Sequence, residues 1–261
     1  MIIENIFEQQ ERVVRKVNLT GNGAHTFVPK EWAGEEVLIV RISKLDIKKE
    51  VLKVLEPFME NIICVILFGS YARGEQSKKS DIDVLIISNK QLKLKQKGMD
   101  IIIITEDKIK KAIDLNPILI YSAISEGVPL VNSFYFEKLK KEKVKPELFK
   151  EFYRSTKLSL KSDKEILELD KEQNLNYISN SVIYSLFLRL RGAYIIKRIL
   201  KGEKYSNRKY KKWLMSNVPD LDYSSFYSIY ASIRDKRSAV DKIDIKVGES
   251  LIDLLSGEIR V

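Results

Sequence analysis

Four residues in one short stretch could handle a phosphate and a metal ion together: Gly69, Ser70, Asp81 and Asp83. Glycine at a strand exit lets the backbone approach a ligand closely, and serine adds a hydroxyl to the free amides there. Side chains alternate across a strand, so the two aspartates point to one face. Adjacent carboxylates repel each other, and Mg²⁺ removes that conflict by binding one or two carboxylates together with substrate phosphates. The stretch therefore predicts phosphoryl or nucleotidyl transfer, in which metal ions neutralise developing charge.

Apolar runs on either side indicate the strands that position these residues. Residues 64–68 and 84–87 are rich in Val, Ile and Leu and are bounded by turn-forming residues, a pattern typical of neighbouring buried strands. Residues 98–104 form a third strand-like run, with Asp100 near its beginning. If this strand pairs beside 84–87, Asp100 joins the two aspartates. The alternative is that Asp100 only caps its strand.

The order Gly69-Ser70, ten intervening positions and then Asp81-Ile82-Asp83 resembles the signature of the polymerase-β-like nucleotidyltransferase superfamily. The longer run GSYARGEQSKKSDIDVLI is similar to the small prokaryotic branch, which includes minimal and kanamycin-type aminoglycoside nucleotidyltransferases. The alternative interpretation is an ordinary strand, turn and strand with two exposed aspartates.

The resemblance implies transfer from a nucleoside triphosphate, with ATP as the expected donor, to a hydroxyl acceptor, with release of pyrophosphate. It also implies a third carboxylate on the following strand, where Asp100 would complete a second metal site and orient or deprotonate the acceptor hydroxyl. Two Mg²⁺ ions are therefore expected. The implied site residues are Gly69, Ser70, Arg73 and Ser80 for the nucleotide, and Asp81, Asp83 and Asp100 for metal binding and catalysis.

Residues 1–42 predict a small β unit. The run Gly21-Asn22-Gly23 marks a turn, and residues 25–28 and 37–42 are strand-like. So few residues make a poor core, so we expect pairing with a second copy or docking onto the next domain. The run GNGAHTFVPKEWAGEEVLIVRI resembles the AbrB/MazE-type swapped-hairpin fold, which implies an interleaved homodimer and, in many members, DNA binding.

Basic residues in this N-terminal unit are candidates for phosphate contacts, although solvated surface positions explain them equally well. They are Arg12, Arg15, Lys16 and Lys30. His25 is the only histidine and has no histidine partner for a zinc site.

The rest of the chain predicts an α+β catalytic domain followed by a helical domain. Residues 43–59 form an amphipathic helical pattern, residues 108–124 a helix broken or entered at Pro117, and residues 127–131 a short edge strand. Residues 136–150 are a linker or a first helix. Four further helices are expected at 152–170, 175–200, 206–215 and 224–240. The predicted domains are residues 1–42, 43–135 and 136–261.

Two sets of basic and aromatic residues recur at helical spacing in the C-terminal domain. They could read a nucleotide base or an acidic substrate across a cleft, or form a charged, solvated face. The bundle resembles those of kanamycin-type nucleotidyltransferases and HEPN domains, but without an Arg-x4-6-His motif HEPN ribonuclease activity is not expected. The sets are Arg189, Arg191, Tyr194 and Arg198, and Tyr230, Arg234 and Arg237.

The composition is that of a globular protein with polyanionic partners. The net charge of +10 and pI near 9.3 favour nucleotides, nucleic acid or an acidic protein, although lysines that keep the surface soluble explain the charge equally. No apolar run is long enough to cross a bilayer, and the N-terminus is unlike a signal peptide, so we expect a cytoplasmic protein. The single Cys64 lies within a predicted strand as a small hydrophobe.

These features predict a Mg²⁺-dependent nucleotidyltransferase whose acceptor is a small molecule or a protein hydroxyl, as in toxin–antitoxin systems. A nucleic-acid 3′ end is a further candidate acceptor, although no additional nucleic-acid-binding module follows the core. The alternative function is a DNA-binding regulator or antitoxin whose catalytic domain senses nucleotide or modifies a partner toxin.

Overall fold

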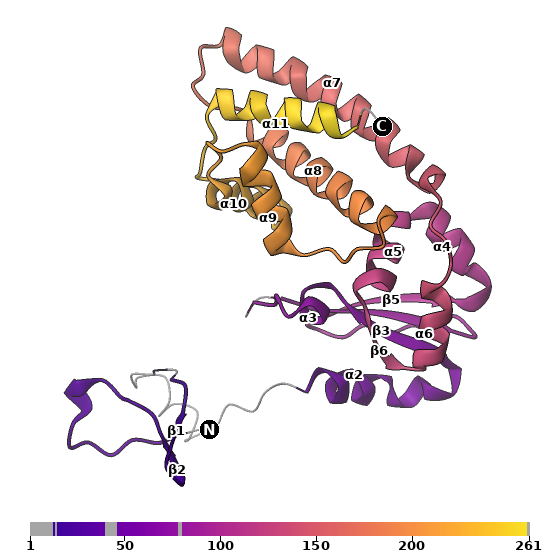
Figure 1. The fold of residues 1–261 in the computed structure, drawn as a ribbon, viewed down its shortest axis with the longest axis vertical. Helices are drawn as coiled ribbons and strands as arrows, with labels where there is room; N and C mark the ends of the chain where they lie inside the picture. Colours follow the sequence, from indigo (N-terminus) through magenta and orange to yellow (C-terminus); the bar gives the residue numbers. More distant parts are fainter. Residues whose placement is uncertain (1–12, 14, 40–45, 78–79, 260–261) are drawn as a thin grey trace. The chain divides into compact units, whose positions relative to one another are not determined.

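The computed structural model describes residues 13, 15–39, 46–77 and 80–259, which divide into two compact units, Met1–Leu45 and Asp46–Val261 (Figure 1). The first unit contains an antiparallel hairpin of β1 (Asn18–Thr20) and β2 (Gly23–His25), followed by the short helix η1 (Lys30–Trp32). Gly21 adopts a φ of 55° in the connecting turn, a conformation that glycine takes at little cost. The predicted turn and small antiparallel sheet are confirmed.

Two strand predictions for this unit are wrong over the described residues. The strand expected at 25–28 ends at His25, and residues 37–39 lie outside any strand. The remaining predicted strand residues, 40–42, lie outside the described residues. A strand needs a partner for its backbone groups. The hydroxyl of Thr26 instead donates a hydrogen bond to the carbonyl oxygen of Lys16 at 3.3 Å, and the pairing of β1 with β2 ends before this residue.

The second unit is built on a four-stranded sheet with the strand order β5-β4-β3-β6. β3 is antiparallel to both β4 and β6, whereas β4 and β5 are parallel. The predicted strands are therefore confirmed as neighbours, and the last of them lies at an edge as predicted. The strands are β3 (Ile62–Phe68), β4 (Ile82–Ser88), β5 (Met99–Thr105) and β6 (Val128–Val131).

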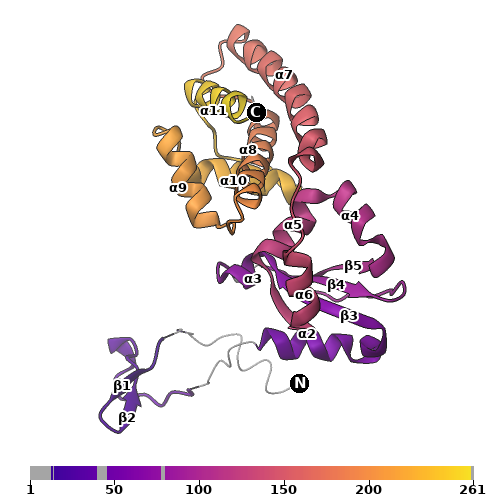
Figure 2. The ribbon, with the colours of Figure 1, turned by 45° about the vertical axis from the view of Figure 1, so that its right-hand side comes forward.

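Helices cover both faces of this sheet because its strands are apolar on both sides (Figures 1 and 2). On one face α2 packs through Val51 and Leu55 against alternate strand residues such as Val65 and Ile86. On the other face α5 and α6 pack against the intervening residues, among them Ile66. These helices are α2 (Ile47–Leu55), α4 (Ile109–Leu115), α5 (Pro117–Glu126) and α6 (Ser133–Lys140), with short turns η2 (Glu56–Asn61), η3 (Glu106–Lys108) and η4 (Pro146–Phe149).

Cys64 lies in the middle of β3 and is fully buried. Burial raises the pKa of its thiol to about 11, so the thiol stays protonated near neutral pH. The prediction of a small buried hydrophobe is confirmed.

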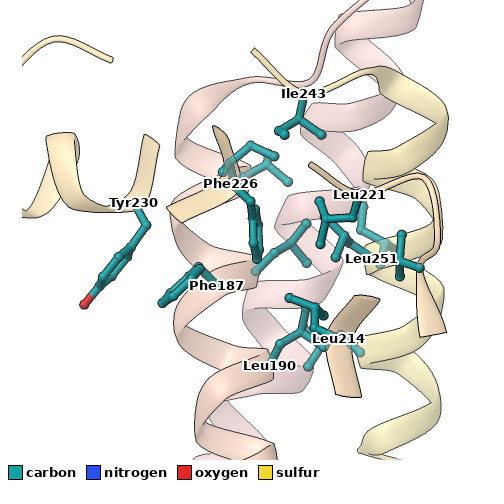
Figure 3. Close-up of a cluster of buried hydrophobic side chains, with 14 of the residues drawn as sticks. Phe187, Leu190, Leu214, Leu221, Phe226, Tyr230, Ile243 and Leu251 are labelled. Atoms are coloured by element: carbon teal, nitrogen blue, oxygen red, sulfur yellow. The ribbon is translucent and has the colours of Figure 1, made fainter. Parts of the chain in front are cut away.

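The C-terminal bundle is organised around α8, whose Phe187 and Leu190 lie in the centre of the core (Figure 3). Phe187 stacks on Tyr230 with ring centroids 4.1 Å apart, and Leu251 of the last helix closes the core. The bundle helices are α7 (Lys150–Glu172), α8 (Asn180–Leu200), α9 (Asn207–Asn217), α10 (Tyr223–Arg234) and α11 (Ile245–Glu258).

The sequence did not predict the last helix, α11, because the predicted helices end near residue 241. Two glycines weaken its helical pattern, and one of them has a packing reason. A Cβ at Gly248 would lie 2.6 Å from Ile178, so glycine lets α11 approach the segment that enters α8. Asp244 caps this helix by accepting a hydrogen bond from the amide of Lys246 at 2.8 Å.

The bundle and the sheet share a core, which fixes them as one unit. Ile196 and Ile199 of α8 are buried in the same cluster as Ile120 and Ile124 of α5. Phe136 of α6 also belongs to this cluster, so the segment after residue 135 packs on the sheet. Within the described part of the chain, no helix combines the length and apolarity needed to cross a membrane.

Candidate active site

The candidate site lies at the edge of the sheet where β3 ends and β4 and β5 begin. Because β3 is antiparallel to β4, Phe68 is opposite Asp83. Because β4 and β5 are parallel, Asp83 is opposite Asp100. Asp81 comes just before β4, so the fold brings all three predicted carboxylates to one edge, where they line the same cavity.

Asp83 carries the strongest electrostatic conflict of the three. Asp83 is half-buried, and its pKa is raised to about 6, mainly because burial disfavours the charged form. The negative charges of Asp100 and Asp81 also raise this pKa, whereas the positive charge of Arg73 lowers it. Among the described residues, no group of three or more His, Cys, Asp or Glu side chains lies close enough together to hold a metal ion as it stands. The available donors are nonetheless hard carboxylate oxygens that face a cavity, and this donor type suits Mg²⁺.

Gly69 makes the close approach to this carboxylate possible. The residues after β3 form a short helix, α3 (Gly69–Arg73). Gly69 has a φ of 69°, and a Cβ at this position would collide with the carboxylate of Asp83. Its amide donates a hydrogen bond to Oε1 of Glu126 at 3.2 Å. Only glycine satisfies both the backbone conformation and the space at this point.

A buried carboxylate holds Arg73 in place. Nη1 of Arg73 lies 2.6 Å from Oε1 of Glu126, and the two side chains are only 10% and 3% exposed. Burial raises the pKa of Glu126 while the charge and hydrogen bond of Arg73 oppose that shift. The other oxygen, Oε2, is buried without a hydrogen-bond partner among the described residues. Glu126 also lines the cavity.

A second carboxylate, Glu75, connects Arg73 to the bundle. Its Oε2 accepts from Nε of Arg73 at 2.9 Å and from the amide of Asn207 at 3.1 Å. Its Oε1 accepts from the hydroxyl of Ser206 at 2.7 Å. Glu75 therefore binds the free amide end of α9, where a negative charge is favourable. Burial would raise the pKa of Glu75, but its hydrogen bonds outweigh this effect and lower the pKa.

Two arginines enclose the ring of Tyr205 between the sheet and the bundle. Arg73 lies 5.2 Å from the ring centroid and Arg191 lies 5.4 Å from it. Nε of Arg191 also donates to the Tyr205 hydroxyl at 3.1 Å. The prediction that the α8 set is a charged, solvated face is therefore wrong for Arg191, which lines the cavity, and for Tyr194, which is buried. Helix packing turns these positions inward.

The carboxylates, the Gly69 turn and the bundle line one cavity of about 1400 Å³. The sheet side contributes the acidic edge. The opposite wall comes from α8, the α8–α9 connection and α10, and it is aromatic and basic. Its residues include Arg191, Tyr205, Tyr223, Tyr227, Tyr230 and Arg234.

Comparison with known proteins identifies the family to which this site belongs. A family model described as "Nucleotidyltransferase domain" matches residues 46–153. A curated protein of Methanocaldococcus jannaschii, named "Putative protein adenylyltransferase MJ0141", is 38% identical over 81 residues, which are 31% of this chain and 78% of the relative. The chain belongs to the nucleotidyltransferase family. The match lies in the part of this nucleotidyltransferase that carries the acidic edge.

Solved structures with some similarity were also found. The spectinomycin adenyltransferase AAD(9) from Enterococcus faecialis, with ATP and spectinomycin, aligns over 82% of this chain and 98% of its own, with 12% identity and a TM-score of 0.42. A nucleotidyltransferase-like protein from Exiguobacterium sibiricum aligns over 82% of this chain and 74% of its own, with 10% identity and a TM-score of 0.37.

Every site residue predicted from the sequence lines the cavity of this nucleotidyltransferase. Asp81 and Asp100 are exposed at its edge, whereas Ser70 and Ser80 are half-buried. Ser80 also accepts a hydrogen bond from the amide of Ser77 at 2.9 Å. The full set is Gly69, Ser70, Arg73, Ser80, Asp81, Asp83 and Asp100.

Sequence reasoning missed the two glutamates that hold Arg73. Glu75 lies inside the motif, and Glu126 is the last residue of α5, immediately before Gly127. A charged residue at the end of an apolar helix was the available signal for Glu126. In the N-terminal unit, Arg15, Lys16 and Lys30 are exposed, and Arg12 lies outside the described residues.

Replacing Gly69 by alanine should remove transfer activity, because the new methyl group must displace the carboxylate of Asp83. We expect a loss of at least about 100-fold in kcat/KM, measured with a radiolabelled nucleoside triphosphate. Gly202→Ala is the matched control, since Gly202 has a φ of 66° with nothing within 4 Å of the added Cβ. It should cost about 1 kcal/mol of stability and leave transfer unchanged. Equal activity losses in both variants would contradict the steric assignment.

Glu75→Gln should weaken the attachment of α9 by about 1–2 kcal/mol at pH 7, measured by urea denaturation. Because the pKa of Glu75 is lowered on folding, its contribution is complete above the ordinary pKa of 4.5 and disappears as pH falls through the lower folded-state value. The difference between wild type and variant should therefore shrink below about pH 4.

Glu151→Gln provides the control for this experiment. Glu151 also lines the cavity, but its ion pair with Arg154 is exposed, with both side chains 71% accessible. This substitution should leave the unfolding free energy unchanged. A pH-independent effect of Glu75→Gln would contradict the charge–helix interaction.

Proposed function

We propose that this enzyme transfers a nucleoside monophosphate, AMP from ATP, to a hydroxyl acceptor and releases pyrophosphate. The observation that carries the proposal is the register of Asp83 with Asp100, beside Asp81, at a sheet edge that faces a large cavity. Carboxylates so arranged repel one another, and this repulsion favours a site that works with a cation bound.

The proposed metal ligands are Asp81, Asp83 and Asp100, which would hold Mg²⁺, two ions being expected. When bound, the metal neutralises charge on the triphosphate and on the leaving pyrophosphate. Gly69 lets the phosphate approach the backbone closely at the β3 exit, and Ser70 binds phosphate oxygens there, with support from Ser80. Arg73 contributes positive charge while Glu126 and Glu75 keep its guanidinium in position.

The acceptor hydroxyl attacks the α-phosphorus of the donor. Its oxygen forms the new bond, the bond to the bridging oxygen of the β-phosphate breaks, and pyrophosphate leaves with that electron pair. Asp100 accepts the hydroxyl proton, because its exposed carboxylate lies on the edge strand β5 and lines the cavity. Asp83 is less suited to this role, since it lies between Asp100 and the Gly69 turn.

An adenylyl donor is favoured by the name of the M. jannaschii relative, a protein adenylyltransferase. That name gives a protein as the acceptor of the relative. The alignment covers 31% of this chain, so most of the chain lies outside it.

The N-terminal unit is proposed to pair with a second copy of the chain. Leu19 and Phe27 are 89% and 72% exposed, and a two-stranded hairpin of this size has little stability alone. The resemblance to AbrB-like hairpins supports the same proposal. The alternative function, a DNA-binding regulator or toxin–antitoxin component, depends on the exposed Arg15, Lys16 and Lys30, which suit a solvated surface equally well.

Asp81→Asn, Asp83→Asn and Asp100→Asn should each reduce transfer of an α-labelled nucleotide by at least about 100-fold, because each removes a negative charge that the metal requires. The label is followed into cell-extract fractions in the presence of Mg²⁺. Chelation with EDTA should abolish transfer, and excess Mg²⁺ should restore it.

Asp107→Asn is the matched control for these substitutions. Asp107 is exposed at the far end of β5 and does not line the cavity. It should retain wild-type transfer. Full activity in Asp83→Asn would refute the proposed metal site, as would transfer that persists in EDTA.

A further inference from the structure

The acidic edge occupies only one end of the cavity, and a second feature runs away from it along α10. Tyr223, Tyr227, Tyr230 and Arg234 recur at spacings of four, three and four residues and therefore share one face of this helix. All four line the cavity. At 1.5 Å per residue, this stripe extends over about 16 Å.

The stripe begins near Glu75, one of the two carboxylates that hold Arg73. Burial raises the pKa of Tyr223, and the negative charge of Glu75 raises it further. Figures 1 and 2 both place α10 on the side of the sheet where α3 begins. The far end of the stripe, at Arg234, lies towards the outer part of the bundle, because Tyr230 stacks on Tyr184 in the first turns of α8.

The aromatic part of the stripe is a rigid platform. Tyr230 is only 6% exposed and stacks on Phe187 with an interplanar angle of 15°. Tyr227 is 45% exposed and lies nearly parallel to Tyr223, with an interplanar angle of 11°. An exposed tyrosine backed by fixed rings presents a flat surface on which a planar ligand can stack.

The outer end of the stripe is positively charged. Arg234 and Arg237 both line the cavity, and the carboxylate of Asp235 accepts from both at 2.8 Å. Two guanidinium groups share a single carboxylate, so an uncompensated positive charge remains. Such a surface attracts phosphate.

The size of the cavity shows that a donor alone does not fill it. Its volume of about 1400 Å³ exceeds the roughly 300–1,000 Å³ that is usual for a site holding one small molecule. Aromatic side chains interleaved with arginines along a groove suit stacked bases and a phosphate backbone.

We propose that the acceptor is a nucleotide, either free or at the 3′ end of a short single strand, with its base on Tyr227 and its phosphate at Arg234 and Arg237. This inference rests on the proposed nucleotidyl transfer. The ribose hydroxyl oxygen forms a bond to the α-phosphorus of the donor, and the bond from that phosphorus to pyrophosphate breaks. The hydroxyl proton passes to a site carboxylate and then to water. The product is a phosphodiester one nucleotide longer than the acceptor.

The test offers the full-length protein a set of acceptors with Mg²⁺ and α-labelled ATP. The set comprises a mononucleotide, a five-nucleotide RNA, the corresponding DNA, the same RNA lacking its 3′-hydroxyl, a polycationic amino sugar and a tyrosine-containing peptide. We expect label on the mononucleotide or on the strands, and none on the 3′-deoxy strand. The first three arms distinguish a free nucleotide from a strand end.

Substitutions then test the stripe itself. Tyr227→Ala and the double variant Arg234→Gln/Arg237→Gln should each raise the acceptor KM by about 10-fold and leave the KM for ATP unchanged. Both changes are at exposed positions, so folding should be retained. Lys236→Gln is the matched control, because it removes a positive charge from the same segment at a residue that does not line the cavity.

Three results would overturn the inference. Label on the amino sugar or the peptide, with none on nucleotides, would leave nucleotidyl transfer intact and reject this acceptor. A raised KM for ATP in the stripe variants would assign the stripe to the donor. Absence of labelled product with every acceptor, and with cell extract, would reject the proposed function as well.

Discussion

The repulsion among carboxylates around Asp83 is the constraint on which the rest of the site depends. The sheet places this residue between the exit of β3 and the edge strand β5, so it loses water and gains a negative neighbour at the same time. A fold that maintains this arrangement sacrifices stability locally, and such sacrifices concentrate at functional sites. The proposed cation would relieve the repulsion among the carboxylates, so these side chains would bind it favourably.

Other features of the molecule follow from this crowded edge. Gly69 has no side chain because the carboxylate occupies that space. Arg73 supplies the nearest positive charge, and two glutamates on different elements hold it. One of them, Glu75, also binds the start of α9, so the catalytic motif and the bundle wall are connected through a few charged hydrogen bonds. The position of the bundle wall therefore depends on the motif itself.

Much of this arrangement is predictable from the sequence, because it depends on local patterns. Apolar runs identified the strands of the sheet. Alternation predicted that Asp81 and Asp83 share a face, and in the structure both line the cavity. Asp100 was predicted because a strand with an acid near its beginning follows directly. Parallel pairing in register with β4 then brings this acid beside Asp83.

The parts that sequence did not reveal depend on contacts between distant segments. Glu75 and Ser206 are far apart in the chain, and no periodic pattern connects them. Arg191 looked like part of a solvated face because its neighbours on α8 are basic, and its partner Tyr205 lies on a separate segment between α8 and α9. The strand predicted at 25–28 failed for the same reason, since a strand requires a partner that composition does not identify.

The most direct test of the central claim is the thermal stability of wild type and Asp83→Asn, each with and without Mg²⁺ and a non-hydrolysable ATP analogue. Without these ligands, the variant should unfold at the same temperature as wild type or higher, because the repulsion is relieved. Saturating ligands should raise the Tm of wild type by about 5 °C and leave the variant unchanged. An equal shift in both proteins, or a less stable variant in the absence of metal, would contradict the account.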